Sequence, residues 1–177
     1  MRRLFTLKYL FIIIIVVLGN AKVSGQVNHV VISQIYGGGG NSGAPYQNDF
    51  IELFNPTATA VSLAGWSVQY ASATGTAWSS TTLLGSIGAG KYYLIKLASN
   101  ALVGLVLPPA DATGTTNMAG AAGKVLLSNA LTVNTTACPN SSTIDFVGYG
   151  TTVNCFEGSG FAPAPSNTTA DLRKLCY

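Results

Sequence analysis

Three cysteines are the residues of this 177-residue chain whose type and spacing most directly suggest chemistry. A disulfide between Cys138 and Cys155 would close a loop of moderate length around an apolar segment. Such bonds persist in proteins that leave the reducing cytosol. We therefore predict a disulfide between Cys138 and Cys155. Cys176 is left over, and three states stay open for it: a free thiol, an intermolecular bond, or a bond to a cysteine absent from this chain.

A metal site is the sharper alternative for these cysteines. His29 is the only histidine, and it could join the three cysteines around zinc. Structural zinc sites usually have paired ligands at close spacing, and no such pair occurs here. Calcium is a second alternative, with loop oxygens near Asp49, Asp111 or Asp145 as ligands. The sequence predicts neither a metal ion nor a cofactor for this chain.

Asp49 and Glu52 are close together in the sequence. They stand three residues apart on an expected strand, so their side chains point to opposite faces. They could not share one metal ion without a bulge. We expect Asp49 to lie in a turn and Glu52 to accept hydrogen bonds or to pair with a lysine.

The sequence lacks the residues that nucleotide binding or catalysis would need. Gly38, Gly40 and Gly43 have the spacing of a dinucleotide-binding fingerprint, but residues 44–49 lead directly into another strand. A pyrophosphate would need the N-terminus of a helix at that place. The only histidine, His29, lies in the N-terminal part of the sequence, and no Gly-x-Ser-x-Gly sequence occurs. We predict a loop between strands, no catalytic residue and no enzyme activity.

Six aromatic residues could instead form a platform on which a carbohydrate stacks. Aromatic residues at strand spacing more often belong to a hydrophobic core. We expect the core role, with the carbohydrate platform as the alternative. These residues are Trp66, Tyr70, Trp78, Tyr92, Tyr93 and Tyr149.

The elements that must position these residues are short strands. In residues 49–54, polar and apolar side chains alternate with a period of two, and Asn55 and Pro56 then give a turn signal. Glycine or proline clusters separate most of the other candidates, which is typical of an all-β sandwich with Greek-key connections. We expect residues 98–122 to form a long surface loop with one helical turn. The predicted strands are Val27 to Tyr36, Asp49 to Phe54, Val61 to Tyr70, Trp78 to Leu84, Tyr92 to Leu97, Lys124 to Ser128 and Thr143 to Gly148.

The first 25 residues have the pattern of a signal peptide. Arg2, Arg3 and Lys8 precede a short apolar stretch at residues 9–18, and small residues follow at 23–25. We predict cleavage after Gly25, with Ala21 as the alternative, and a secreted or cell-surface protein. An uncleaved anchor is the competing interpretation, although the apolar stretch is short for a membrane span.

Cleavage would leave five basic residues against six acidic ones, so the basic balance of the full chain comes from the leader. The remaining cations are scattered singly, which gives no support for nucleic-acid binding. About 150 residues remain, enough for one domain. We predict a domain at residues 26–160 and an extended tail at residues 161–177, which covers an edge strand or forms a truncated linker.

The sequence of residues 49–55, a polar turn and residues 61–68 resembles the lamin-tail domain family in its bacterial secreted form. Further blocks with the same resemblance lie at residues 31–40, 145–150 and 154–160. Together the blocks cover about Val30 to Lys174. The resemblance implies an immunoglobulin-like β-sandwich.

The resemblance also implies a place in larger proteins, because such domains occur at the N-terminus of secreted endonuclease/exonuclease/phosphatase-type proteins. Our first hypothesis is an exported, non-catalytic binding or anchoring module at or outside the cell surface, with a protein or carbohydrate ligand. The competing hypothesis is the N-terminal fragment of a secreted nuclease or phosphatase whose catalytic domain is missing from this chain. It is motivated by Leu175 to Tyr177, which depart from the family pattern.

Overall fold

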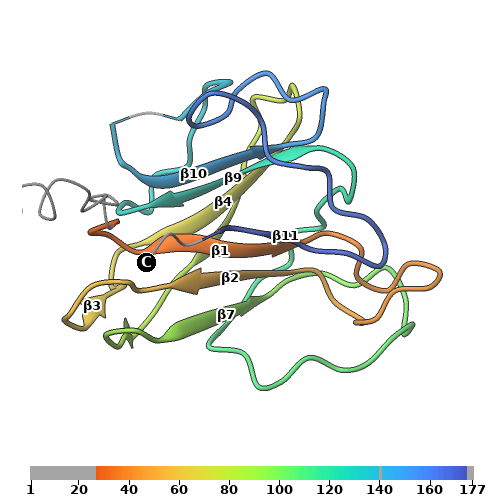
Figure 1. Ribbon diagram of the computed structural model, residues 1–177, viewed down its shortest axis with the longest axis horizontal. Coiled ribbons are helices and arrows are strands. Elements are labelled where there is room, and N and C mark those ends of the chain that lie inside the picture. Colours follow the sequence, from red (N-terminus) through yellow and green to blue (C-terminus); the bar gives the residue numbers. More distant parts are fainter. Residues whose placement is uncertain (1–26, 140, 175–177) are drawn as a thin grey trace, which may run out of the picture.

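The computed structural model describes residues 27–139 and 141–174, which form two facing β-sheets (Figure 1). The predicted signal peptide and Cys176 lie outside these residues. The described part of the chain contains no helix, and so none that could cross a membrane. Its strands are β1 Val31–Tyr36, β2 Phe50–Phe54, β3 Val61–Ser62, β4 Ser67–Ser72, β5 Ser79–Thr82, β6 Ser86–Ile87, β7 Tyr92–Lys96, β8 Ala112–Thr113, β9 Gly123–Ser128, β10 Thr143–Tyr149 and β11 Asp171–Leu172.

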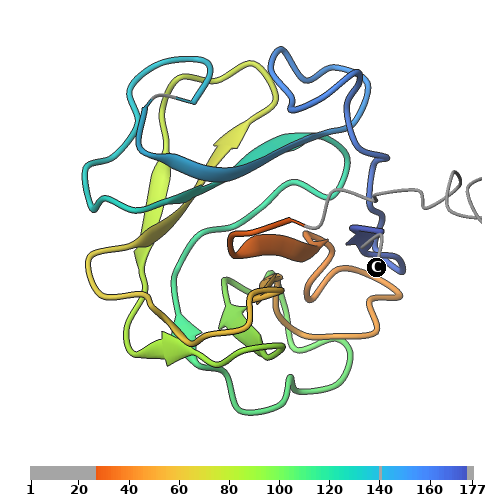
Figure 2. The ribbon, with the colours of Figure 1, turned by 60° about the vertical axis from the view of Figure 1, so that its left-hand side comes forward.

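The first sheet has the strand order β11-β1-β2-β7-β8, and the second has the order β10-β9-β4-β5. Strands β3 and β6 form a separate pair. All neighbouring strands are antiparallel except β7 and β8. Figure 2 shows the space between β1 and the β9–β10 pair, which side chains of the core fill. The predicted all-β, immunoglobulin-like sandwich is therefore confirmed.

The main core lies between the two sheets. Ile51, Leu53 and Ile95 contribute to it from β2 and β7, and Val125 and Leu127 contribute from β9. Each of these five side chains is fully buried. Their alternation along the strands is the period of two that a half-buried strand requires. The pattern seen in residues 49–54 therefore reflects the inner face of the first sheet.

The sequence predicts residues 61–70 as one strand with a bend or bulge at Gly65; the irregularity at Gly65 is confirmed, but the single strand is wrong. Gly65 has a φ of 81°, a left-handed conformation that favours glycine and ends the extended run. Residues 61–62 pair with β6, whereas residues 67–72 pair with β5 and β9 in the second sheet. The first predicted strand also starts later than expected, at Val31 and not at Val27.

The predicted helical turn in residues 98–122 is also wrong. Residues 112–113 form β8, which pairs in parallel with β7. Asp111 N–H donates to the Leu94 carbonyl at 2.9 Å, and Gly114 N–H donates to the Lys96 carbonyl at 2.8 Å. These bonds satisfy backbone groups that a helical turn would have used internally.

The segment after residue 160 returns to the sandwich. Its residues 171–172 form β11, which pairs with the edge of β1 through Gln34 and Ile35. Arg173 N–H extends the contact by donating to the Ser33 carbonyl at 2.9 Å. Strand β1 is therefore covered at the edge that would otherwise be open in the first sheet.

Candidate functional site

Two long loops meet where β1 and β7 finish and β2 begins. We call residues 37–49 and 97–111 together the loop end, which lies to the right of the strands in Figure 1. Gln47 N–H donates to the Leu105 carbonyl at 2.9 Å, and Leu105 N–H donates to the Pro45 carbonyl at 2.8 Å. The two loops therefore hold each other in one defined arrangement.

Asp49 anchors this arrangement to the sandwich. Its side chain is fully buried, and its two oxygens accept hydrogen bonds from Gly39 N–H and Met118 N–H, each at 2.8 Å. Gly39 must be glycine, because a Cβ there would approach the backbone of Asn48 and Asp49 within 2.1 Å. Asp49 thus lies in the connection before β2, as expected. Its buried carboxylate also connects the segments around Gly39 and Met118 through hydrogen bonds.

Burial raises the pKa of Asp49 from 3.8 to about 6, although its bonds to Met118 and Gly39 act in the opposite direction. No lysine or arginine occurs in residues 37–48 or 98–110 to stabilise the charged form. The carboxyl group therefore changes its charge in mildly acidic solution.

We expect acidification from pH 7 to pH 4 to raise the free energy of unfolding through Asp49 by about 2 kcal/mol. The folded protein binds this proton more tightly than the unfolded chain, so stability rises as the pH falls through 6 and levels off below the ordinary pKa. Denaturant unfolding of the wild type and Asp49→Asn at pH 7, 5.5 and 4 measures the difference. Parallel pH profiles of the two proteins would contradict this assignment.

The outermost part of the loop end is a run of aliphatic side chains. We call Leu102, Val103, Leu105 and Val106 the aliphatic tip; their exposed fractions are 87%, 38%, 71% and 73%. The next residue, Leu107, turns inward and packs with Tyr36 and Phe50 in a small cluster outside the main core. Exposed apolar side chains that cluster in this way often mark an interaction surface.

The backbone fixes the direction in which the tip points. Gly104 has a φ of 95°, and a Cβ at this position would lie 2.6 Å from the Ala44 carbonyl oxygen. Its own carbonyl accepts a hydrogen bond from the Gln47 side-chain amide at 3.2 Å. Ser99 adds bonds from its hydroxyl to the carbonyls of Gln47 and Ala101. The tip is therefore exposed on a loop that hydrogen bonds hold in place.

A chain of amide side chains lies beside the tip. Asn117 donates to Asn100 at 2.9 Å, Asn100 donates to Asn41 at 2.8 Å, and Asn41 donates to Asn167 at 3.1 Å. These bonds are exposed and join both loops of the loop end to the segment before β11. The tip is therefore surrounded by uncharged polar groups, since residues 37–48 and 98–110 also contain no charged side chain.

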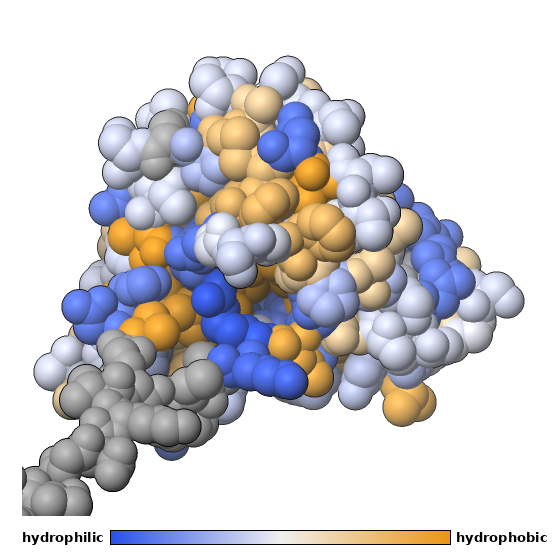
Figure 3. All heavy atoms as spheres, turned by 45° about the horizontal axis from the view of Figure 1, so that its top comes forward, coloured by the Kyte–Doolittle hydropathy of each residue, from blue (hydrophilic) through white to orange (hydrophobic). Residues whose placement is uncertain are grey.

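A groove of about 500 Å³ is the second candidate site, lined by β1, β10, β11 and residues 157–163. On the face shown in Figure 3, hydrophilic residues lie in a hollow between hydrophobic ones. Arg173 in its wall donates to both oxygens of Asp145, at 2.9 and 2.8 Å, and to the Ile32 carbonyl at 3.0 Å. These groups serve the contact between the sheets, so they give the groove little with which to recognise a ligand.

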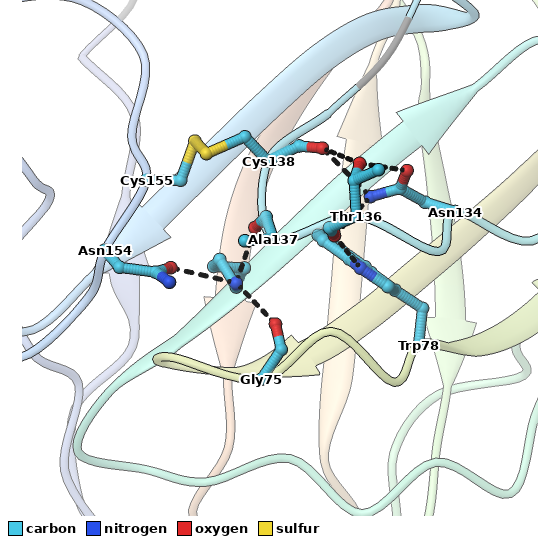
Figure 4. The surroundings of a disulfide bond; sticks show 9 residues. Gly75, Trp78, Asn134, Thr136, Ala137, Cys138, Asn154 and Cys155 are labelled. Atoms are coloured by element: carbon cyan, nitrogen blue, oxygen red, sulfur yellow. Dashed lines mark hydrogen bonds between the residues drawn. A yellow bond between two sulfur atoms is a disulfide. The ribbon is translucent and has the colours of Figure 1, made fainter.

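The disulfide joins Cys138 and Cys155 as the sequence predicts, with Cα atoms 5.6 Å apart. Gly75, Ala137 and Asn154 converge beside it in Figure 4. The ammonium group of Lys124 donates to their oxygens at 2.8, 2.6 and 3.0 Å and lies 5.4 Å from the centre of the nearby Trp78 ring. Lys124 is fully buried, whereas Asn154 and Cys138 at the rim of this arrangement are exposed.

The acidic residues do not come together as a catalytic or metal site. Within the described ranges, no group of three potential metal ligands is close enough to hold an ion. Glu52 accepts a hydrogen bond from the Ser33 hydroxyl at 2.7 Å, and Asp111 accepts one from Leu94 N–H at 2.8 Å. The glycines at residues 38–43 belong to the loop end, and no helix follows them.

Most of the six aromatic residues are core residues, so they do not form one platform. Tyr70, Tyr93 and Tyr149 belong to the main core, and Trp66 packs against it. Trp78 belongs to a second cluster, and only Tyr92 is largely exposed, at 56%. The core interpretation therefore holds for five of the six.

Sequence reasoning missed the aliphatic tip as a candidate site. The apolar run before Pro108 was visible, and so was the absence of charge around it. These signals do not distinguish a buried run from an exposed one. The direction of the side chains depends on the contact with residues 45–47, which lie more than 50 positions earlier in the chain.

A comparison with known families identifies the family to which this fold belongs. A family model described as Lamin Tail Domain matches residues 24–151, well over half of the chain. A search of curated proteins gives no match to the sequence. The match includes both sheets up to the end of β10, the loop residues 37–49 and the aliphatic tip. The chain therefore belongs to the lamin tail domain family.

Proposed function

We propose that this protein is an exported, non-catalytic binding or anchoring module that attaches to the cell surface through its loop end. The observation that carries the proposal is the exposure of Leu102, Leu105 and Val106 on a loop fixed by hydrogen bonds. Burying such side chains on contact is favourable by about 25 cal/mol for each Å² removed from water. A surface that stays ordered before contact also loses less entropy on binding.

Three further features support this function. The leader pattern in residues 1–25 favours export, and the disulfide suits an oxidising compartment. The near-neutral charge of the cleaved chain favours a partner that is not recognised through charge. The polar groups of the groove and of Lys124 are already bonded within the protein, which leaves the loop end as the better contact surface.

We expect the change Leu102→Ser/Leu105→Ser to release the protein from the cell surface. The full chain, with its leader, is expressed in the cells that produce it, and its distribution between cells and medium is measured. The matched control Leu84→Ser/Leu131→Ser removes two leucines with exposed fractions of 69% and 53% elsewhere on the surface. The cell-bound fraction should fall about tenfold in the first variant and stay unchanged in the control. Equal retention of all three proteins would overturn the proposal.

The finer family assignment is also part of the proposal: a bacterial secreted form of the kind found in front of nuclease-type or phosphatase-type domains. Its basis is the resemblance of the sequence blocks at residues 31–40, 49–68 and 145–160. The alternative, a fragment of such an enzyme, would be supported by a catalytic domain encoded after Tyr177.

A further inference from the structure

We propose that the aliphatic tip inserts into the interfacial region of a lipid bilayer with zwitterionic headgroups. This inference rests on the proposed function, because it names the partner of the same loop end. Leu102, Leu105 and Val106 would enter the boundary between headgroups and acyl chains, and the sandwich would stay in water. The protein would then lie on the membrane surface without crossing it.

The shape of the tip favours a lipid partner over a protein partner. Its four aliphatic side chains lie within the five residues 102–106, and three of them are more than two-thirds exposed. A stable protein interface usually uses about 20–30 residues on each side and a complementary surface. A lipid interface sets no such requirement on a small patch of exposed side chains, because acyl chains adapt to its shape.

The residue types point the same way. Protein interface hot spots are enriched in tryptophan, tyrosine and arginine, whereas leucine and valine are under-represented. The tip consists of leucine and valine with one glycine. Aliphatic side chains are among the residues whose transfer into a bilayer is most favourable.

The surroundings of the tip determine which lipids fit it. No lysine or arginine occurs in residues 37–48 or 98–110, so attraction to anionic lipids contributes little. No aspartate or glutamate occurs there either; the two acids of the loop end are Asp49, which is buried, and Asp111, just before β8, whose carboxylate accepts a hydrogen bond from Leu94 N–H. The amides of Asn41, Asn100 and Gln47 and the hydroxyl of Ser99 form hydrogen bonds within the loop end, so the surroundings of the tip are polar but uncharged.

The test uses the chain from Gln26 to Tyr177, which keeps all eleven described strands and lacks the apolar leader. It is floated with vesicles of pure phosphatidylcholine. We expect the wild type to bind and Leu102→Ser/Leu105→Ser to bind about tenfold more weakly. The control Leu84→Ser/Leu131→Ser should bind like the wild type. Raising the salt concentration or adding phosphatidylserine should change binding by less than about twofold.

A tryptophan placed at the tip reports insertion directly. In Val106→Trp, emission should shift to shorter wavelength when phosphatidylcholine vesicles are added. Leu84→Trp, at an exposed site elsewhere, should show no shift. Unfolding measurements on each variant confirm that the fold is kept. A shift in both variants, or in neither, would overturn the inference.

Failure of this inference is distinguishable from failure of the proposed function. If the wild type does not bind vesicles but the tip variant is still released from cells, the loop end binds a protein or glycan. The lipid inference is then wrong and the proposed function stands. If the tip variant stays on the cells, the loop end is not the attachment surface, and both are wrong.

Discussion

Asp145→Ala is expected to lower the free energy of unfolding by about 3–5 kcal/mol. The side chain of Asp145 is 1% exposed and lies on β10 in the second sheet. It accepts a hydrogen bond from Ile32 N–H of β1 at 2.7 Å and two bonds from Arg173. Its removal would leave the buried N–H of Ile32 and the guanidinium group of Arg173 without their acceptor. An unsatisfied buried donor destabilises the fold by more than the hydrogen bond itself contributes to stability.

This residue therefore joins β10, at the edge of the second sheet, to β1 of the first sheet. Burial raises the pKa of Asp145, although the nearby Arg173 guanidinium acts to lower it. Arg173 also donates through Nε to the Ile32 carbonyl at 3.0 Å. Both backbone groups of Ile32 are thus bonded by side chains from two other elements, β10 and the segment after β11.

Urea unfolding followed by tryptophan fluorescence measures the effect, and two further variants make the test specific. Glu157 Oε2 lies 3.9 Å from Arg173 Nη2, and the Glu157 side chain is 58% exposed. Glu157→Ala should therefore lower the free energy of unfolding by less than about 1 kcal/mol. Asp145→Ala and Arg173→Ala should each destabilise, and the double variant should lose much less than their sum. Additive losses would mean that the two side chains do not act as a pair.

Lys124→Met is expected to lower the free energy of unfolding by about 3 kcal/mol. Methionine keeps most of the apolar stem but cannot donate, so three acceptors near the disulfide lose their partner: Gly75, Ala137 and Asn154. A hydrogen bond to a charged group contributes about 1.5–3 kcal/mol, and solvent replaces part of this loss because Gly75 and Ala137 are half-buried and Asn154 is exposed. The net destabilisation is smaller than the sum of these lost bonds, because burying the charged ammonium group is itself unfavourable. The same burial lowers the pKa of Lys124.

Lys91→Met is the matched control for this substitution. Lys91 is exposed, and its side chain takes part in no described ion pair, so the change should stay within about 0.5 kcal/mol. The comparison separates the loss of the buried bonds from the general effect of a lysine-to-methionine change. Equal stability of Lys124→Met and the wild type would show that solvent reaches these three oxygens.

The sequence predicted the features that depend on near neighbours. Alternation along residues 50–54 places Ile51 and Leu53 on the inner face, and both are fully buried in the main core. The disulfide was predictable because its cysteines are 17 residues apart and lie on the connections that flank β10. Period and short separation are properties that a single sequence displays directly.

Features that depend on distant parts of the chain were not predictable in the same way. Lys124 looked like one of several scattered cations, because its three acceptors lie between 13 and 49 residues away. Asp145 gave no sign of its partners, since Ile32 is 113 residues distant. The strand pairing of residues 112–113 and 171–172 likewise depends on which edges the larger strands leave uncovered.

The position of Arg173 also sets an order of events during synthesis. Arg173 is 141 residues from Ile32, whose carbonyl it binds, whereas the cysteines of the disulfide are 17 residues apart. Contacts over long separations form slowly because much chain entropy is lost when such loops close. A nascent chain can therefore assemble the region around β10 before its first strand obtains its edge partner. The link between Arg173 and Ile32 can form only after residue 173 has been made, later than the bond from Ile32 N–H to Asp145.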